Sequence, residues 1–381
     1  MARLPPLTGS FVCIMGNLLM HSRRPPSGLM GAVLLLMILL VATEAVAVEW
    51  MMQADVDGNR LEGKPIYMSS DRTQLLLRDG QVREFPTAVA RNVRQTAPRF
   101  RPYTAGELRS RLAAEFGNEF EVSGTGHYLV VHPRGTRDLW AERFEDLYRS
   151  FRHYFAVRGF QLHEPEFPMV AIVWKDEAQF RAYALREGAR ITPNTLGYYS
   201  PTSNRVTLYD TAGGSRDWTQ NADTIIHEVT HQSAFNTGIH ARFGNTPRWL
   251  AEGLATMFEP RGVWNSAQYR TSGDRINQGR LRDFQNYLNE GHQDGHLMQM
   301  IESDRFFDAD GSRGYALAWA LSFYLVETQP RRYADYLAKT AARDGSQPYG
   351  SAARLKDFTD VFGPNMRLLE AQFLRYMAGV R

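Results

Sequence analysis

The sequence contains almost no cysteine and has little excess charge of either sign. Its single cysteine, Cys13, lies in the N-terminal segment that is expected to be a leader. The rest of the chain can therefore form no disulfide, cysteine zinc site or thiol nucleophile. The formal net charge of the 381 residues is +3, and no internal repeat or low-complexity segment is present. This balance argues against a nucleic-acid-binding role, which would require a clustered basic face.

Long apolar runs are also absent, with one exception, LMGAVLLLMILLVA near the N-terminus. Arg23 and Arg24 precede this run, and Ala45-Val46-Ala47 offers a small-x-small cleavage site, so residues 1–47 are predicted to be a signal peptide. The run is shorter than the roughly 20 apolar residues of a membrane span. A cleaved signal is therefore favoured, with a retained N-terminal membrane anchor as the alternative. We expect an exported protein of the periplasm, cell envelope or extracellular space.

The next part of the chain has the pattern of a small all-β module. Short alternating stretches in residues 48–90 are separated by the turn dipeptides Asp57-Gly58, Glu62-Gly63 and Asp79-Gly80. This pattern predicts a five-stranded, SH3-like barrel. Residues 91–102 carry two prolines and several arginines, and they are predicted to be a linker.

Beyond residue 103 the pattern becomes mixed. An amphipathic helix is predicted over 138–157, because its aromatic residues recur every three to four positions. After Pro260 the chain is expected to be helical, with an apolar helix at 315–326 and an amphipathic helix at 365–377. The strands predicted between residues 103 and 210 are FEVSG, HYLVVHP, FPMVAIVW and NRVTLYD. The predicted fold class is therefore α+β.

The segment NADTIIHEVTHQSAF contains the pattern H-E-x-x-H, formed by His227, Glu228 and His231. At about 100° per residue, these three side chains share one face of a helix. Two imidazoles one turn apart can converge on a single metal ion. Glu228 is offset from that ion, so it is predicted to be the general base that takes a proton from a metal-activated water.

A carboxylate suited to complete the ligand set is Glu252, in the segment TPRWLAEGLATMFEP. This segment is predicted to be a separate helix between Pro247 and Pro260. Gly253 disfavours a helix unless two backbones pass closely, so we expect this helix to cross the histidine helix there. Two imidazoles, one carboxylate and a water form a typical hydrolytic zinc site. The predicted ligands of one zinc ion are His227, His231 and Glu252.

HEVTH followed by PRWLAEGLA resembles the gluzincin clan of zinc metallopeptidases, which includes thermolysin. Together with GYYSPTSNRVTLYD and GYALAWALSFYL, these motifs resemble more narrowly the bacterial DUF1570 family, whose members are exported gluzincin-like proteins of unassigned function. The resemblance implies a gluzincin-like domain over residues 103–381, with a mixed sheet over the active-site helix and a helical C-terminal part. It implies that His227, His231 and Glu252 bind the zinc ion and that Glu228 is the catalytic base. It also implies an edge strand that pairs with an extended substrate, for which we expect residues 204–210.

The sequence departs from thermolysin-like enzymes at Thr256, where they place an Asp that orients a metal-bound histidine. Three carboxylates are alternatives for that role: Glu259, Asp210 and Asp223. The best candidate for stabilising the oxyanion is Tyr315. Weaker candidates are Tyr198, Tyr199, Tyr209 and His240.

These observations predict a zinc-dependent hydrolase of peptide bonds that acts on a peptide or protein and needs no other cofactor. The alternative is a non-catalytic zinc- or peptide-binding envelope protein on a gluzincin scaffold. The departure at Thr256 favours that alternative, whereas the intact Glu228 argues against it. A third reading has the hydrolase act on cell-wall peptides or on a non-peptide amide.

Overall fold

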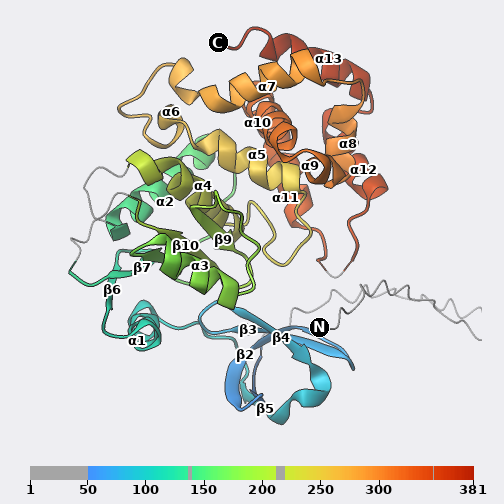
Figure 1. The fold of residues 1–381 in the computed structure, drawn as a ribbon. Helices are drawn as coiled ribbons and strands as arrows, with labels where there is room; N and C mark the ends of the chain where they lie inside the picture. The colour runs from blue at the N-terminus through green and yellow to red at the C-terminus, as the bar shows by residue number, and fades with distance from the viewer. Residues whose placement is uncertain (1–49, 136–139, 212–218, 346) are drawn as a thin grey trace, which may run out of the picture. The chain divides into compact units, whose positions relative to one another are not determined.

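The computed structural model describes residues 50–135, 140–211, 219–345 and 347–381 (Figure 1). The predicted leader, residues 1–47, lies outside the described residues, as does Cys13. Within the described ranges, no helix is both long enough and apolar enough to cross a bilayer.

The first five strands form one antiparallel sheet in the order β4-β3-β2-β1-β5. They are β1 (Met51–Val56), β2 (Asn59–Met68), β3 (Arg72–Leu77), β4 (Val82–Pro86) and β5 (Arg91–Ala97), with the short 3-10 helix η1 (Thr87–Val89) before β5. Asp57 and Gly58 both have positive φ, as the tight turn of the β1-β2 hairpin requires. Met52, Ala54 and Leu75 lie in the module's small apolar core. The prediction of an all-β module is thus confirmed.

The predicted linker is wrong over residues 91–97. These residues form β5, which pairs with β1 in the sheet. Six of the seven residues of β5 are exposed. The strand is therefore held mainly by its backbone pairing with β1. It was missed because its sequence lacks the alternation of apolar and polar residues by which strands are predicted.

A second, mixed sheet has the order β6-β7-β8-β10-β9. Its strands are β6 (Phe120–Gly124), β7 (Tyr128–Pro133), β8 (Met169–Trp174), β9 (Gly197–Ser200) and β10 (Arg205–Tyr209). The two central pairings, β7-β8 and β8-β10, are parallel, and the two outer ones are antiparallel. The structure corrects the predicted edge strand: β10, within residues 204–210, lies between β8 and β9, and β9 forms the edge.

Helices cover both faces of this sheet. Helices α1 (Ala105–Phe116) and α3 (Glu177–Arg186) pack with Leu129 and Ile172 in one apolar cluster. Helices α2 (Trp140–Ala156) and α4 (Thr219–Asn236) pack with Val130 and Ala171 in the other cluster. Because neighbouring residues of a strand point to opposite faces, β7 and β8 supply both clusters. Helix α4 is therefore seated on the sheet, as predicted for the helix that carries the motif.

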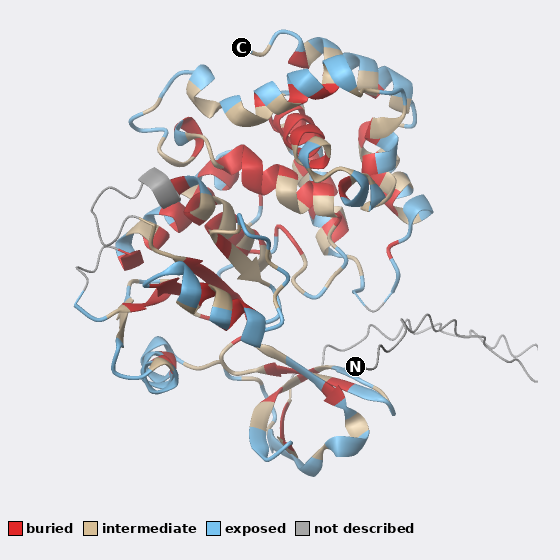
Figure 2. Cartoon of the chain, in the orientation of Figure 1, coloured by how far each residue is buried: buried red, intermediate tan, exposed pale blue. Residues whose placement is uncertain are grey.

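The remainder of the chain is helical, as predicted. Its elements are α5 (Arg248–Phe258), α6 (Arg261–Trp264), η2 (Gly273–Arg275), α7 (Gln278–Glu290), α8 (His296–Glu302), α9 (Arg305–Ala309), α10 (Gly311–Thr328), α11 (Pro330–Ala341), α12 (Ser351–Phe362) and α13 (Met366–Met377). Figure 1 shows α10 surrounded by other helices, among them α5, α7 and α9. Twelve of its 18 residues are buried, so most of the helix is red in Figure 2. The α+β class is therefore confirmed, with α10 as the core of the helical part.

Candidate metal centre

Helix α4 presents the motif because its two sides differ in polarity. Ile225, Ile226 and Val229 are fully buried in the apolar cluster beneath the sheet. His227 and His231 lie one turn apart on another side of the helix, and both are half-buried. Packing of the apolar side thus fixes the direction in which the two imidazoles point.

The three predicted ligands lie together. One ligand atom from each of His227, His231 and Glu252 lies within 4.8 Å of the other two. The two Nε2 atoms of the histidines are 3.1 Å apart. Glu252 Oε2 lies 3.3 Å from Nε2 of His227 and 3.5 Å from Nε2 of His231. This oxygen is buried and has no well-oriented hydrogen-bond partner among the described residues. A cation would satisfy it, because buried carboxylates are normally paired or bound to a metal.

Glu259 holds His227 from the other side of the ring. Its Oε1 lies 2.8 Å from Nδ1 of His227, so Nδ1 carries the proton and donates it. When the ring loses its second proton to bind a metal, the lone pair of Nε2 faces the cluster, as a metal-ligating histidine requires. Of the three alternatives for this role, the structure places Glu259 in contact with His227. Asp223 lines the cleft one turn earlier on α4, and Asp210 lies just after β10.

Asn277 supports Glu259 and was not anticipated from the sequence. Its Nδ2 donates to Glu259 Oε2 at 2.6 Å and to the carbonyl of Thr256 at 3.1 Å. Its Oδ1 accepts from the backbone N–H of Arg280 and caps α7. An Asn before a helix signals a cap, but the contact with Glu259 depends on tertiary packing.

The electrostatics of the cluster follow from these contacts. Burial disfavours the charged form of His227, but the carboxylates of Glu252 and Glu259 nearby outweigh it and raise the pKa of His227 well above its ordinary value. The metal-free ring is therefore protonated, and a metal ion would displace the proton from Nε2. Burial likewise disfavours the Glu252 carboxylate, but the imidazoles of His227 and His231 nearby hold its pKa well below the ordinary value. Glu252 is therefore ionised, as a metal ligand must be.

Glu228 faces a cleft of about 510 Å³ that His227 and Asn277 also line. Its Oε2 accepts a 2.6 Å hydrogen bond from the backbone N–H of Tyr199 on β9. The edge strand and the predicted base are thus directly connected. This contact was also missed from the sequence, because Tyr199 was considered only for its hydroxyl.

Tyr315 lies beside Glu252 and Arg248, at the start of the buried part of α10. Burial, aided by the Glu252 carboxylate, raises the pKa of Tyr315 to about 12, so its hydroxyl stays protonated. Three other candidates lie elsewhere. The Tyr199 hydroxyl donates to Asn204, whereas Tyr198 and Tyr209 pack in the cluster on the opposite face of the sheet.

His240, the remaining candidate, is buried behind His231. Only 2% of its surface is exposed, and its ring lies 5.2 Å from that of Phe235. Neither ring nitrogen has a hydrogen-bond partner among the described residues. Burial and the nearby His231 lower the pKa of His240 to about 3, so the ring is neutral.

Gly253 marks a close approach of two helices, but the partner differs from the expected one. A Cβ at this position would lie 2.3 Å from Ser322 Oγ and 2.5 Å from the carbonyl oxygen of Ala318. Both residues belong to α10. The close approach at Gly253 is therefore made by α10 and not by the histidine helix, although α5 contacts both helices. The packing of α5 against α10 helps to fix the position of Glu252.

Comparisons with known proteins bear on this region. No curated protein matches the chain. Among solved structures, an M1 zinc metallopeptidase from Deinococcus radiodurans matches with 17% identity and a TM-score of 0.36, over 67% of this chain and 48% of that chain. A mutant M1 zinc metallopeptidase from the same organism, bound to a Tyr-Ser-Ala substrate, matches with 16% identity and a TM-score of 0.39, over 68% of this chain and 51% of that chain. The chain spans about half the length of these structures.

The profile of the family described as "Protein of unknown function (DUF1570)" matches residues 221–346. Over the residues that contain the His227, His231 and Glu252 cluster, the chain thus matches the DUF1570 family, as its motifs indicated.

Proposed function

We propose that the chain is an exported zinc-dependent hydrolase of peptide bonds. The observation that carries this proposal is the cluster of His227, His231 and Glu252, with the buried Oε2 of Glu252 left without a well-oriented partner among the described residues. Two neutral imidazoles and one carboxylate form the usual ligand set of a catalytic zinc ion. When bound there, zinc would supply Lewis-acid chemistry, polarising a carbonyl group and making water more acidic.

Glu228 is proposed as the general base. Its Oε2 is engaged by the N–H of Tyr199, which leaves Oε1 to accept a proton from water and later to give it to the leaving amine. Tyr315 is proposed to donate its hydroxyl proton in a hydrogen bond to the reacting carbonyl oxygen, because that hydroxyl stays protonated.

An extended peptide is the substrate class that suits this cleft. Strand β9 is the edge of the mixed sheet, and Gly197 at its start lines the same cleft as His227 and Glu228. A peptide added beside β9 would be held through its backbone, largely independently of its side chains. We therefore replace the predicted substrate strand, residues 204–210, by β9.

The main argument for a non-catalytic protein was the Thr that replaces the orienting Asp. Glu259 now supplies a carboxylate to His227 from seven residues beyond Glu252. The argument for a binding-only protein is correspondingly weaker, so hydrolysis is the function we propose.

The test combines metal content with peptide turnover. The purified exported chain should contain about one zinc ion and cleave members of a quenched fluorescent peptide library until a chelator is added. Glu228→Gln should keep the zinc and lower turnover by at least about 10²-fold. His231→Ala should lose both zinc and turnover, whereas His153→Ala, at an exposed histidine of α2, should change neither. Full zinc content in His231→Ala would refute the ligand assignment. Turnover that survives Glu228→Gln would refute the role of the base.

A further inference from the structure

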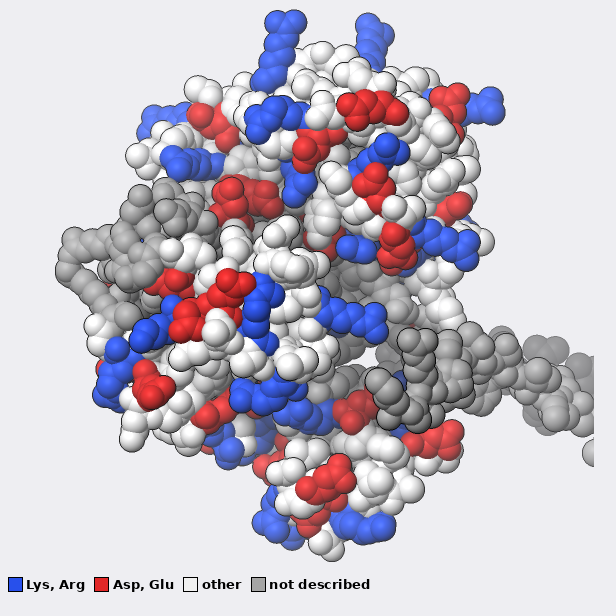
Figure 3. All heavy atoms as spheres, in the orientation of Figure 1, with Lys and Arg blue, Asp and Glu red and all other residues white. Residues whose placement is uncertain are grey.

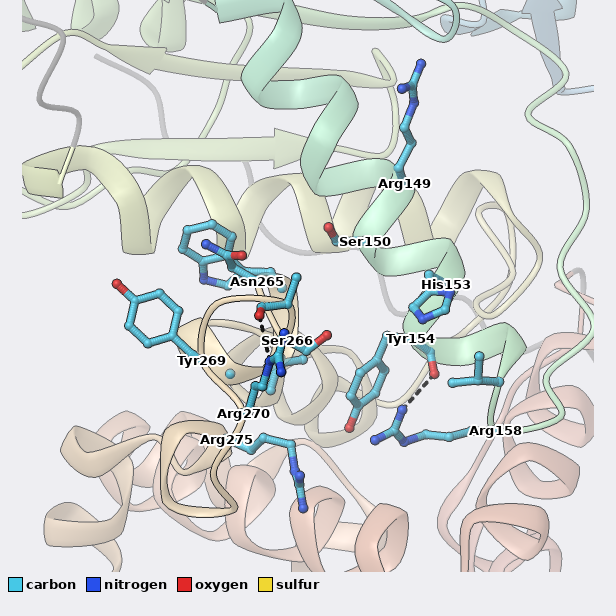
Figure 4. Close-up of a pocket in the computed structure, with 15 residues that line it drawn as sticks. Arg149, Ser150, His153, Tyr154, Arg158, Asn265, Ser266, Tyr269, Arg270 and Arg275 are labelled. Atoms are coloured by element: carbon cyan, nitrogen blue, oxygen red, sulfur yellow. Dashed lines mark hydrogen bonds between the residues drawn. The ribbon is translucent and has the colours of Figure 1, made fainter.

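A second cavity, of about 640 Å³, lies between α2 and the segment 262–275 (Figure 4). One wall comes from the C-terminal half of α2 and the turn after it, including Ser150, Tyr154 and Arg158. The other wall includes Trp264 and Tyr269. Its volume is typical of a pocket for a small molecule. None of the residues proposed to bind zinc or to act as base lines it.

The lining of this cavity, which we call the arginine pocket, is positively charged. It contains four arginines, Arg149, Arg158, Arg270 and Arg275, together with His153. No Asp or Glu lines it among the described residues. On the face drawn in Figure 3, by contrast, basic and acidic side chains are interspersed. The cleft at the candidate metal centre is lined by Asp223, Glu228, Glu259 and Asp283, with Arg280 as its basic residue. The two cavities therefore suit ligands of opposite charge.

Two of the arginines are only partly neutralised. Arg149 Nε lies 3.0 Å from Glu145 Oε1, and Arg275 Nη2 lies 3.1 Å from Glu327 Oε2. Arg275 Nε is nevertheless buried without a hydrogen-bond partner among the described residues. A buried donor of this kind normally has an acceptor, which a ligand would provide.

The other two arginines form no ion pair with any described residue. Arg270 Nε donates to the carbonyl of Ala267 at 3.0 Å. Arg158 Nη1 donates to the carbonyl of Tyr154 at 3.0 Å, and its guanidinium lies 3.6 Å from the centre of the Tyr154 ring. Figure 4 shows the guanidinium of this arginine beside the lower end of Tyr154. The contacts hold the guanidinium in place, so little side-chain entropy would be lost when it binds an anion.

We propose that the arginine pocket binds a small polyanion that carries phosphate or carboxylate groups. Arginine forks match the oxygens of both groups, and these charge-assisted hydrogen bonds are among the strongest in proteins. The aromatic rings of Trp264 and Tyr269 give the remainder of the ligand an apolar surface. This proposal does not depend on zinc binding or on peptide hydrolysis.

The test measures binding of pyrophosphate and of citrate to the whole exported chain by calorimetry at low ionic strength. Binding of at least one probe is expected, and the tighter probe tells whether phosphate or carboxylate is preferred. Arg158→Gln with Arg270→Gln should weaken that binding by about 10-fold or more, because two charged donors are lost. The matched control is Arg282→Gln with Arg331→Gln, which removes two exposed arginines outside the pocket.

A second pair of variants tests the pocket without removing any arginine. Ser150 is half-buried and lines the pocket. Ser150→Glu should abolish binding by adding a negative charge, whereas Ser150→Gln, of similar size, should retain most of it. Glu228→Gln should bind the probes like the wild type. No binding of either probe at millimolar concentration would overturn the proposal, as would an equal loss in the control arginine pair.

Discussion

Glu259→Gln is the substitution that tests the support of the candidate metal centre most directly. Glu259 accepts a hydrogen bond at each oxygen, from His227 Nδ1 at 2.8 Å and from Asn277 Nδ2 at 2.6 Å. A glutamine offers one oxygen and one NH₂ group in nearly the same space. Whichever way the amide is turned, its NH₂ group faces a donor, so one of the two hydrogen bonds is lost.

Asn277 cannot easily turn to restore the lost bond. Its Oδ1 caps α7 by accepting from the N–H of Arg280, and its Nδ2 also donates to the carbonyl of Thr256. A flip of the Asn277 amide would therefore restore the bond to residue 259 but lose the bonds to Arg280 and Thr256. Loss of a hydrogen bond to a charged group costs about 1.5–3 kcal/mol. We expect zinc affinity to fall about 10- to 100-fold, the usual effect of removing a group that orients a metal ligand.

Competition between the protein and a fluorescent zinc chelator, at constant pH, measures this change. The matched control is Asp223→Asn, which removes the same charge from the same cleft. Asp223 lies one turn before His227, but it is Glu259 that contacts the ring. We expect the control to change zinc affinity less than about threefold, because an exposed charge acts weakly in water. Wild-type affinity in Glu259→Gln, or the same loss in Asp223→Asn, would contradict the proposed role of Glu259.

Two other substitutions test the packing around the centre. Gly253→Ala should lower the free energy of unfolding by about 1–3 kcal/mol, because its Cβ would collide with Ser322 Oγ. The control Gly106→Ala should cause no such loss, because its Cβ meets no described atom within 4 Å. Equal losses of the two variants in denaturant titrations would contradict the proposed collision. His240→Leu should raise the free energy of unfolding by about 1–2 kcal/mol by removing two buried nitrogens that have no partner among the described residues. The pKa of His240 is about 3 in the folded chain and about 6.5 when exposed, so the unfolded chain binds more protons and the wild type loses stability as the pH falls through this range. In urea titrations between pH 7 and pH 4, the free energy of unfolding should therefore fall less for His240→Leu than for the wild type. An equal fall in both proteins would refute the buried, neutral state proposed for His240.

The candidate centre was predictable where its geometry is local. The spacing of His227 and His231 places both rings on one side of any helix, so the sequence alone brings them together. Glu252 could be predicted as the third ligand because its segment forms a second helix close in sequence to the first. Glu259 was one of three alternatives, because sequence spacing does not tell which carboxylate reaches a ring on another helix.

Other features were not predictable because they depend on pairing between distant segments. Strand β5 has six exposed residues out of seven, so it lacks the apolar alternation by which strands are found. Strand β10 was recognised, but its place inside the sheet depends on its pairing with the preceding strand, β9. Gly253 correctly indicated a close helix contact, yet a glycine does not specify which helix approaches it.

The hydrogen bond from Tyr199 to Glu228 has a consequence for how this protein tolerates change. The donor is a main-chain N–H, so alanine at position 199 would remove the ring and its hydroxyl contact but leave this hydrogen bond intact. The location of that N–H depends on the pairing of β9 with β10, in which Tyr199 stands opposite the buried Val206. Replacements in the sheet interior would therefore shift the carboxylate of Glu228 without altering any residue that lines the cleft.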